Sequence, residues 1–169
     1  NHKIITSIRP KWLNVRTGRT RVMDAEPPDG AVGWVFDSKG NPRVAYSQVD
    51  GKSATHWRGP GDKQWRRLTQ DEVLKAKFSP EAVDDVGNLY VTEIDESGFS
   101  VLKLFAFNTG KPKASALLET PGFDFSGSVL TRPGTSALGV HVTTDAEQTI
   151  WFDERMKRAQ ALVDAQLPG

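Results

Sequence analysis

The fold of this 169-residue chain is indicated most clearly by residues 78–119, which read FSPEAVDDVGNLYVTEIDESGFSVLKLFAFNTGKPKASALLE. Short apolar segments alternate here with turn signals at 85–88, 96–98 and 108–110. Glycine and asparagine tolerate the positive φ angles that tight hairpins demand. The pattern therefore predicts a four-stranded antiparallel meander.

The same arrangement of turns recurs along the chain. Gly40, Gly87 and Gly134 follow one another at intervals of 47 residues, and in the second turns (50–51, 97–98 and 145–146) Gly51, Gly98 and Asp145 keep that interval. Four-stranded propeller blades repeat at about 40–50 residues. We therefore predict an all-β fold, a β-propeller fragment of antiparallel blades with a C-terminal helix. An ordinary β-sandwich with evenly spaced hairpins is the alternative.

The predicted fragment holds about three repeats and a partial one, at 1–28, 29–77, 78–122 and 123–152. Outside the central repeat, alternating patterns predict strands at 4–8, 12–15, 19–23, 31–36, 43–49, 53–58, 64–68, 126–131, 137–143 and 148–152.

Two features of the second repeat yield local predictions. The hairpin around residues 59–62 is expected to place Trp57 opposite Trp65, a bulky pair suited to packing between sheets. A ligand-stacking role for these two side chains is the alternative. The polar segment 69–77 is predicted to connect two repeats at the surface, and Asp71 could cap a helical turn there.

The periodicity changes to a helical one after Asp153, which is a suitable N-cap residue. We predict a helix at 153–166. Its apolar positions recur at helical spacing: Phe152, Met156, Ala159, Val163 and Leu167. The basic side chains Arg155, Lys157 and Arg158 are most simply solvated, and a docking surface is the alternative.

Composition limits the classes of function. The formal net charge of +1 gives no bulk attraction to nucleic acid or anionic lipid. No run of about 18 apolar residues predicts a membrane span, so we expect a soluble protein without membrane or nucleic-acid partners. The chain has no cysteine, no signal-peptide pattern and no initiator Met, as expected of an excised or processed piece. The compartment stays open between cytoplasm and periplasm.

The sequence offers no convincing catalytic or metal-binding motif. A Gly-x-Ser-x-Gly pentapeptide does not occur. His56 and His141 stand singly in predicted strands, where a hydrogen-bonded structural histidine is the simpler interpretation. The acidic clusters at 84–85 and 93–96 lie at hairpin ends, which acidic side chains commonly shape. We therefore predict no catalytic residue, no metal and no cofactor for this chain.

Three stretches resemble serine peptidases of the prolyl-oligopeptidase type, related to dipeptidyl aminopeptidases and acylaminoacyl peptidases. Residues 12–22 (WLNVRTGRTRV) look like a blade-closing hairpin of their propellers, and residues 31–45 (AVGWVFDSKGNPRVA) resemble the following blade. Residues 151–169 are similar to the helical link of that family, which ends in Leu-Pro-Gly before further blades.

The resemblance implies a non-catalytic propeller segment that gates peptide access to an α/β-hydrolase domain of the same parent chain. That domain carries the family's Ser-Asp-His triad, and no position of this sequence matches it. A fragment of a propeller would also leave strand edges uncovered, so we expect an open arc or self-association. From position alone, we assign peptide binding to Trp34, Arg43 and Glu93.

Two other functions stay open. A stand-alone propeller-like module would bind a protein partner. A propeller enzyme, such as a lactonase or glycosidase, would need convergent carboxylates or a metal at the centre of the blades.

Overall fold

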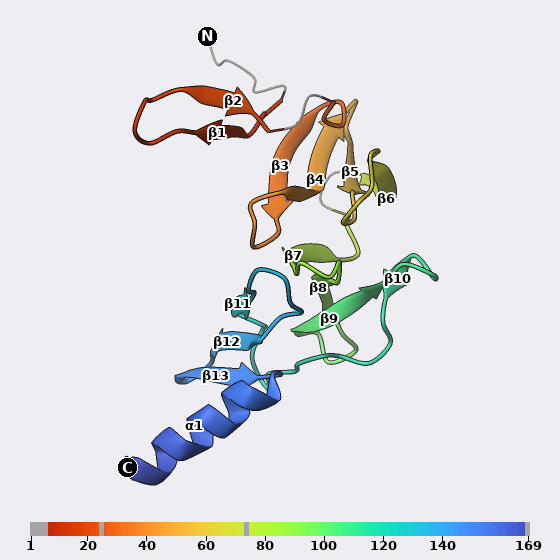
Figure 1. Cartoon of the computed structure of the whole chain (residues 1–169). Helices are drawn as coiled ribbons and strands as arrows, with labels where there is room; N and C mark the ends of the chain where they lie inside the picture. Colours follow the sequence, from red (N-terminus) through yellow and green to blue (C-terminus); the bar gives the residue numbers. More distant parts are fainter. Residues whose placement is uncertain (1–6, 24–25, 73–74, 168–169) are drawn as a thin grey trace. The chain divides into compact units, whose positions relative to one another are not determined.

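The computed structural model describes residues 7–23, 26–72 and 75–167. The chain divides into two compact units, the N-terminal unit (Asn1–Lys77) and the C-terminal unit (Phe78–Gly169). Both consist mainly of antiparallel β-sheet, and an α-helix lies at the C-terminal end (Figure 1). The predicted antiparallel β class with a C-terminal helix is confirmed, and the sheets are open rather than closed into a barrel.

The N-terminal unit contains a small hairpin and a four-stranded sheet (Figure 1). The hairpin pairs β1 (Lys11–Leu13) with β2 (Thr20–Val22). Strands adjacent in sequence are also adjacent in the sheet, which consists of β3 (Ala31–Phe36), β4 (Pro42–Val49), β5 (Lys52–Trp57) and β6 (Arg66–Glu72). The predicted meander of this repeat is therefore present.

The turn between β4 and β5 shows how the sequence sets the register of this sheet. Asp50 has a φ of 50° and Gly51 a φ of 73°, so both central residues of the two-residue turn are left-handed. This is the combination that a type I′ hairpin requires, and Asp-Gly is one of the sequences that adopts it most readily. Val49 consequently pairs with Lys52, and the regular ladder of β4 and β5 follows from there.

The C-terminal unit contains two sheets. The first is the predicted meander, with the order β10-β9-β8-β7; its strands are β7 (Ser79–Val83), β8 (Leu89–Ile94), β9 (Ser100–Ala106) and β10 (Lys111–Pro112). The second has the order β11-β12-β13, with strands β11 (Gly127–Leu130), β12 (Gly139–Thr143) and β13 (Glu147–Trp151). The third predicted repeat thus has three strands, followed by the helix.

The core of the C-terminal unit lies between its two sheets. Buried side chains of β8 and β9, Tyr90 and Leu102, join Val140 and Val142 of β12 in one cluster. Phe125 and other partly buried apolar side chains pack around them. Full burial of a side chain of this size contributes about 1.5–3 kcal/mol, so this contact is a main source of stability for the unit.

The helix α1 (Glu154–Gln166) begins as predicted. The carboxylate of Asp153 accepts hydrogen bonds from the backbone N–H groups of Arg155 and Met156, at 2.9 and 3.2 Å. No residue of α1 is buried. Of the predicted apolar positions, Phe152 packs against the core of the C-terminal unit, whereas Val163 and Leu167 are exposed.

Two predictions for the second repeat are wrong. Trp57 pairs with Arg66 rather than Trp65, because Trp65 precedes β6 and a bulge beside Thr55 and His56 shifts the register. Asp71 caps no helical turn, since it lies within β6 and pairs with Ser53. The strand extends to Glu72 because the chain continues to form the ladder with β5.

The first strands are shorter than predicted. Part of the predicted strand at 4–8 lies outside the described residues, and Ser7 and Ile8 are not in a strand. β1 ends at Leu13 because the side chain of Asn14 accepts hydrogen bonds from the N–H groups of Arg16 and Thr17. Such local bonds from asparagine favour a turn over a continued strand.

Candidate functional site

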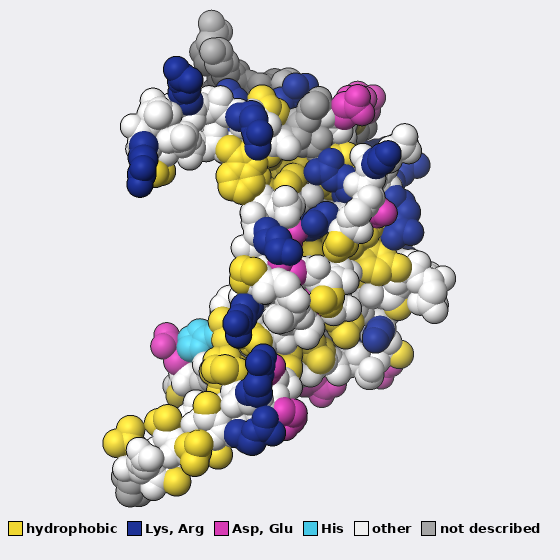
Figure 2. Space-filling model, viewed as in Figure 1, with side chains coloured by type: hydrophobic (Ala, Val, Ile, Leu, Met, Phe, Trp, Pro, Cys, Tyr) yellow, Lys and Arg dark blue, Asp and Glu magenta, His cyan; other side chains and the backbone are white. Residues whose placement is uncertain are grey.

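An open groove of about 620 Å³ lies over β4, β5 and β6 of the N-terminal unit. Its lining includes the side chains of Lys52, Arg58, Lys63 and Arg67. Figure 2 shows Lys and Arg side chains over the part of the molecule that contains these strands. We call this hollow the basic groove.

The alternation of the strands places Lys52 and Arg67 on one face of the sheet, and Arg58 and Lys63 follow in the connection between β5 and β6. Positions 52, 54 and 56 share a face of β5 because successive side chains point to opposite sides. His56 pairs with Ala45 on one side and Arg67 on the other. Ala54 also lines the groove, and its small side chain adds little bulk to the floor.

Ser47 and His56 form a hydrogen bond on the floor of the groove, with 2.9 Å between Oγ and Nε2. Burial and, to a smaller extent, the positive charge of Arg67 lower the pKa of His56. The imidazole is therefore neutral at pH 7. A serine activated by a histidine usually needs a third group that orients the imidazole, and no carboxylate of the described residues hydrogen-bonds His56. We interpret the pair as a structural contact.

Aromatic and cationic side chains form one end of the groove. The guanidinium of Arg58 lies over the ring of Trp65, with 4.5 Å from its central carbon to the ring centroid. Trp65 in turn contacts Trp34 edge to face, with 5.6 Å between centroids. Stacking of this kind holds a guanidinium plane in place.

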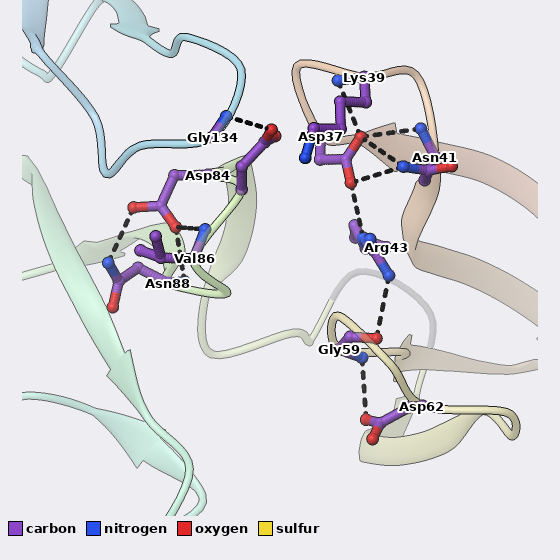
Figure 3. Close-up of polar contacts among 11 residues, drawn as sticks. Asp37, Lys39, Asn41, Arg43, Gly59, Asp62, Asp84, Val86, Asn88 and Gly134 are labelled. Carbon is purple, nitrogen blue, oxygen red and sulfur yellow. Dashed lines mark hydrogen bonds and ion pairs between the residues drawn. The ribbon is translucent and has the colours of Figure 1, made fainter.

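Arg43, a predicted peptide-binding residue, belongs to a buried network instead of the groove (Figure 3). Its Nε donates to the carboxylate of Asp37 at 2.8 Å, and another guanidinium nitrogen donates to the carbonyl oxygen of Gly59 at 2.9 Å. Burial alone raises the pKa of Asp37, but hydrogen bonds from Asn41 and Arg43 and the charge of Arg43 hold it below its usual value.

The other two predicted residues are also engaged within the chain. The indole N–H of Trp34 donates to the carbonyl oxygen of Ile8 at 3.0 Å. Glu93, in the C-terminal unit, forms an ion pair with Lys103, with 2.9 Å between its carboxylate and the ammonium. Trp34 and Arg43 belong to the N-terminal unit, and Glu93 belongs to the C-terminal unit. Their assignment to peptide binding stays a prediction.

His141 is hydrogen-bonded as the sequence suggested. Its Nδ1 lies 3.2 Å from the hydroxyl of Thr149, the residue opposite it in β13. Within residues 7–23, 26–72 and 75–167, no group of three or more histidines and carboxylates is arranged to hold a metal ion. In the same residues, no helix is long and apolar enough to cross a membrane.

Sequence reasoning missed the basic groove. Its cations are scattered over 16 positions, and only the strand register brings them to one face. The alternation of Lys52, His56 and Arg58 along one strand was the available signal, since it places polar groups where a core face would be apolar. Comparisons with protein-family models, curated proteins and solved structures returned no match.

Proposed function

We propose that this chain is a non-catalytic, propeller-type segment of a serine peptidase of the prolyl-oligopeptidase type. In this proposal, the segment gates the access of peptides and supports an α/β-hydrolase domain of the same parent chain. The peptidase assignment rests on the sequence resemblance of residues 12–22, 31–45 and 151–169.

The observation that supports the propeller most directly is the repetition of whole sheets. Residues 31–72 and 79–112 each form a separate four-stranded antiparallel meander, and residues 127–151 form a third sheet. The first two begin with the same turn sequence, Asp-x-x-Gly-Asn, at Asp37 and Asp84. One sheet per repeat is the organisation of propeller blades, whereas a sandwich distributes consecutive hairpins over two sheets.

The native coding sequence beyond Gly169 tests the peptidase assignment. The proposal expects further β-repeats and then a Gly-x-Ser-x-Gly turn, with Asp and His following in an α/β stretch of about 250 residues. A stop codon directly after further repeats would overturn it.

If that sequence encodes the hydrolase domain, the gating role has its own test in the full-length enzyme. We expect kcat/KM to fall steeply as unstructured peptide substrates lengthen, because the propeller restricts entry. Equal rates for short and long substrates would argue against a gate.

A stand-alone binding module is the second candidate function. The basic groove favours it, because an open hollow lined by cations can bind a ligand without any catalytic group. If the chain is part of such a module, we expect the gene to end soon after the remaining repeats. In either case, uncovered strand edges would promote self-association, which sedimentation at several protein concentrations would detect.

A further inference from the structure

We infer that the basic groove is a binding site for an extended acidic peptide segment. The inference goes beyond the proposed function, because it concerns only the residues of the N-terminal unit and names a ligand class for them. It holds for a peptidase segment and for a binding module alike.

Charge is the first argument. Four cationic side chains line the groove, from Lys52, Arg58, Lys63 and Arg67, against the two carboxylates of Glu26 and Asp29. The remaining titratable group on the floor, His56, is neutral at pH 7 because burial and Arg67 lower its pKa. The lining therefore has an excess of positive charge, while the chain as a whole has a net charge of only +1. The local excess favours an anionic ligand.

Shape is the second argument. From Lys52 to Trp57 the strand β5 rises by about 17 Å, at about 3.3 Å per residue, and Arg58 follows directly after it. The cations are spread along this length rather than gathered at one point. Lys52 lies beside the β4–β5 turn, where it pairs with Val49. Arg67 lies near the other end of β5, where it pairs with His56. A single phosphate or carboxylate would reach only part of this lining. An extended peptide of about six residues, with acidic side chains on one edge, matches the whole.

The Arg58–Trp65 contact is the third argument. The stacked guanidinium has lost much of its conformational freedom before a ligand arrives, so binding costs less entropy. Further along the groove, the small side chains of Ser47 and Ala54 leave room for the backbone of a peptide.

A nucleic-acid strand is the competing ligand, since cations and a partly exposed indole also suit it. Two observations favour the peptide. The carboxylates of Glu26 and Asp29 also line the groove; a phosphate backbone carries a negative charge on every nucleotide and would meet them, whereas uncharged residues of a peptide can lie beside them. The near-neutral chain also lacks the general positive charge that draws nucleic acids.

Isothermal titration calorimetry tests the inference. The probe is a peptide of about eight residues with alternating Glu and Gly and blocked ends, and its matched control has Gln in place of Glu. We expect saturable binding of the Glu peptide, a fall in affinity when the salt concentration rises from about 50 to 300 mM, and much weaker binding of the Gln peptide.

Matched variants locate the site. Lys52 and Lys63 are exposed, so Lys52→Ala with Lys63→Ala should leave the fold intact, which circular dichroism checks. We expect this double variant to lose affinity about fivefold or more, since each screened ion pair contributes up to about 1 kcal/mol. Lys111→Ala with Lys113→Ala removes the same charge from exposed positions of the C-terminal unit and should change nothing.

Three outcomes would overturn the inference: no saturable binding of the Glu peptide, equal binding of the Gln peptide, or equal losses in both double variants. Tighter binding of a single-stranded oligonucleotide than of the Glu peptide would also overturn it. None of these results bears on the downstream gene sequence, so this inference and the peptidase proposal can fail separately.

Discussion

The β3–β4 turn and the β7–β8 turn have the same sequence motif, Asp-x-x-Gly-Asn, and nearly the same local hydrogen bonds. The buried carboxylates of Asp37 and Asp84 accept from the backbone N–H of Asn41 and Asn88, at 2.9 and 2.8 Å, and from the amide side chains of the same asparagines. In both turns the carboxylate also accepts from the N–H two residues ahead. The motif therefore forms the same kind of turn in both sheets.

The turns differ at the sixth residue after the aspartate. In the first turn this residue is Arg43, whose charged side chain joins Asp37 to the carbonyl of Gly59 in the same sheet. In the second it is Tyr90, whose hydroxyl donates to Asp84 at 3.0 Å. Burial, followed by the charge of Asp84 and their hydrogen bond, raises the pKa of Tyr90, so the hydroxyl stays a neutral donor.

In the second turn, carboxylates also accept hydrogen bonds from backbone N–H groups of the next repeat. The N–H of Ala137, in the loop before β12, donates to Asp84 at 3.3 Å. The N–H of Gly134 donates to Asp85 at 2.7 Å, and Figure 3 shows this bond. One turn thus closes its own sheet through an ion pair, whereas the other joins two sheets through neutral donors. The choice of side chain at one position separates these roles.

The largest effect is expected from Asp84→Ala. The side chain is fully buried and accepts from five donors: the N–H groups of Val86, Asn88 and Ala137, the Asn88 amide and the Tyr90 hydroxyl. Buried donors without a partner cost about 1–3 kcal/mol each. Because some donors will reach water, we expect the free energy of unfolding to fall by about 3–5 kcal/mol. Amide hydrogen exchange in β8 and β12 measures this change. A smaller fall than that of Arg43→Ala would contradict the comparison of the two turns.

Much of this comparison could be predicted from the sequence, because local rules decide it. The turns that were predicted from glycine positions are present: Gly40 and Gly87 both have positive φ, at 76° and 93°. The 47-residue interval also placed Asp37 and Asp84 in equivalent positions. Alternation identified most strands within one or two residues, since each buries one face.

The rest depended on contacts between distant residues. The bulge that pairs Trp57 with Arg66 leaves no local signal, so the predicted Trp57–Trp65 pair failed. The bonds of Arg43 to Asp37 and to the carbonyl of Gly59 likewise could not be predicted, because no local pattern indicates them. Long-range partners, rather than propensities, decide which polar side chains are available to a ligand.

The second prediction concerns the ion pair of the first turn. Arg43→Ala leaves the carboxylate of Asp37 with its turn donors but without its charged partner, and it removes the donor to Gly59. Hydrogen bonds that involve charged groups contribute about 1.5–3 kcal/mol, so we expect the free energy of unfolding to fall by an amount in this range. Urea unfolding followed by tryptophan fluorescence measures it. Arg43→Lys should restore part of the loss; if it restores none, the charge is not what matters.

A smaller effect is expected from Tyr90→Phe, which removes one neutral hydrogen bond and keeps the ring in the core between the two sheets. A neutral hydrogen bond contributes about 1 kcal/mol, and Asp84 retains its other donors. We therefore expect a loss of about 1 kcal/mol, read from hydrogen exchange in β8. A loss as large as that of Arg43→Ala would mean that the neutral and charged partners are equivalent.

The smallest effect is expected from Asp85→Ala, which cuts the contact between the second turn and the loop before β12. The bond from the N–H of Gly134 is exposed, so water can replace Asp85 and the global loss should stay at about 0.5 kcal/mol. The local effect should be clearer, because the Gly134 amide loses its acceptor and exchanges faster, while the amide of Gly40 in the first turn serves as an unchanged reference. Unchanged exchange at Gly134 would mean that this bond does not hold the loop.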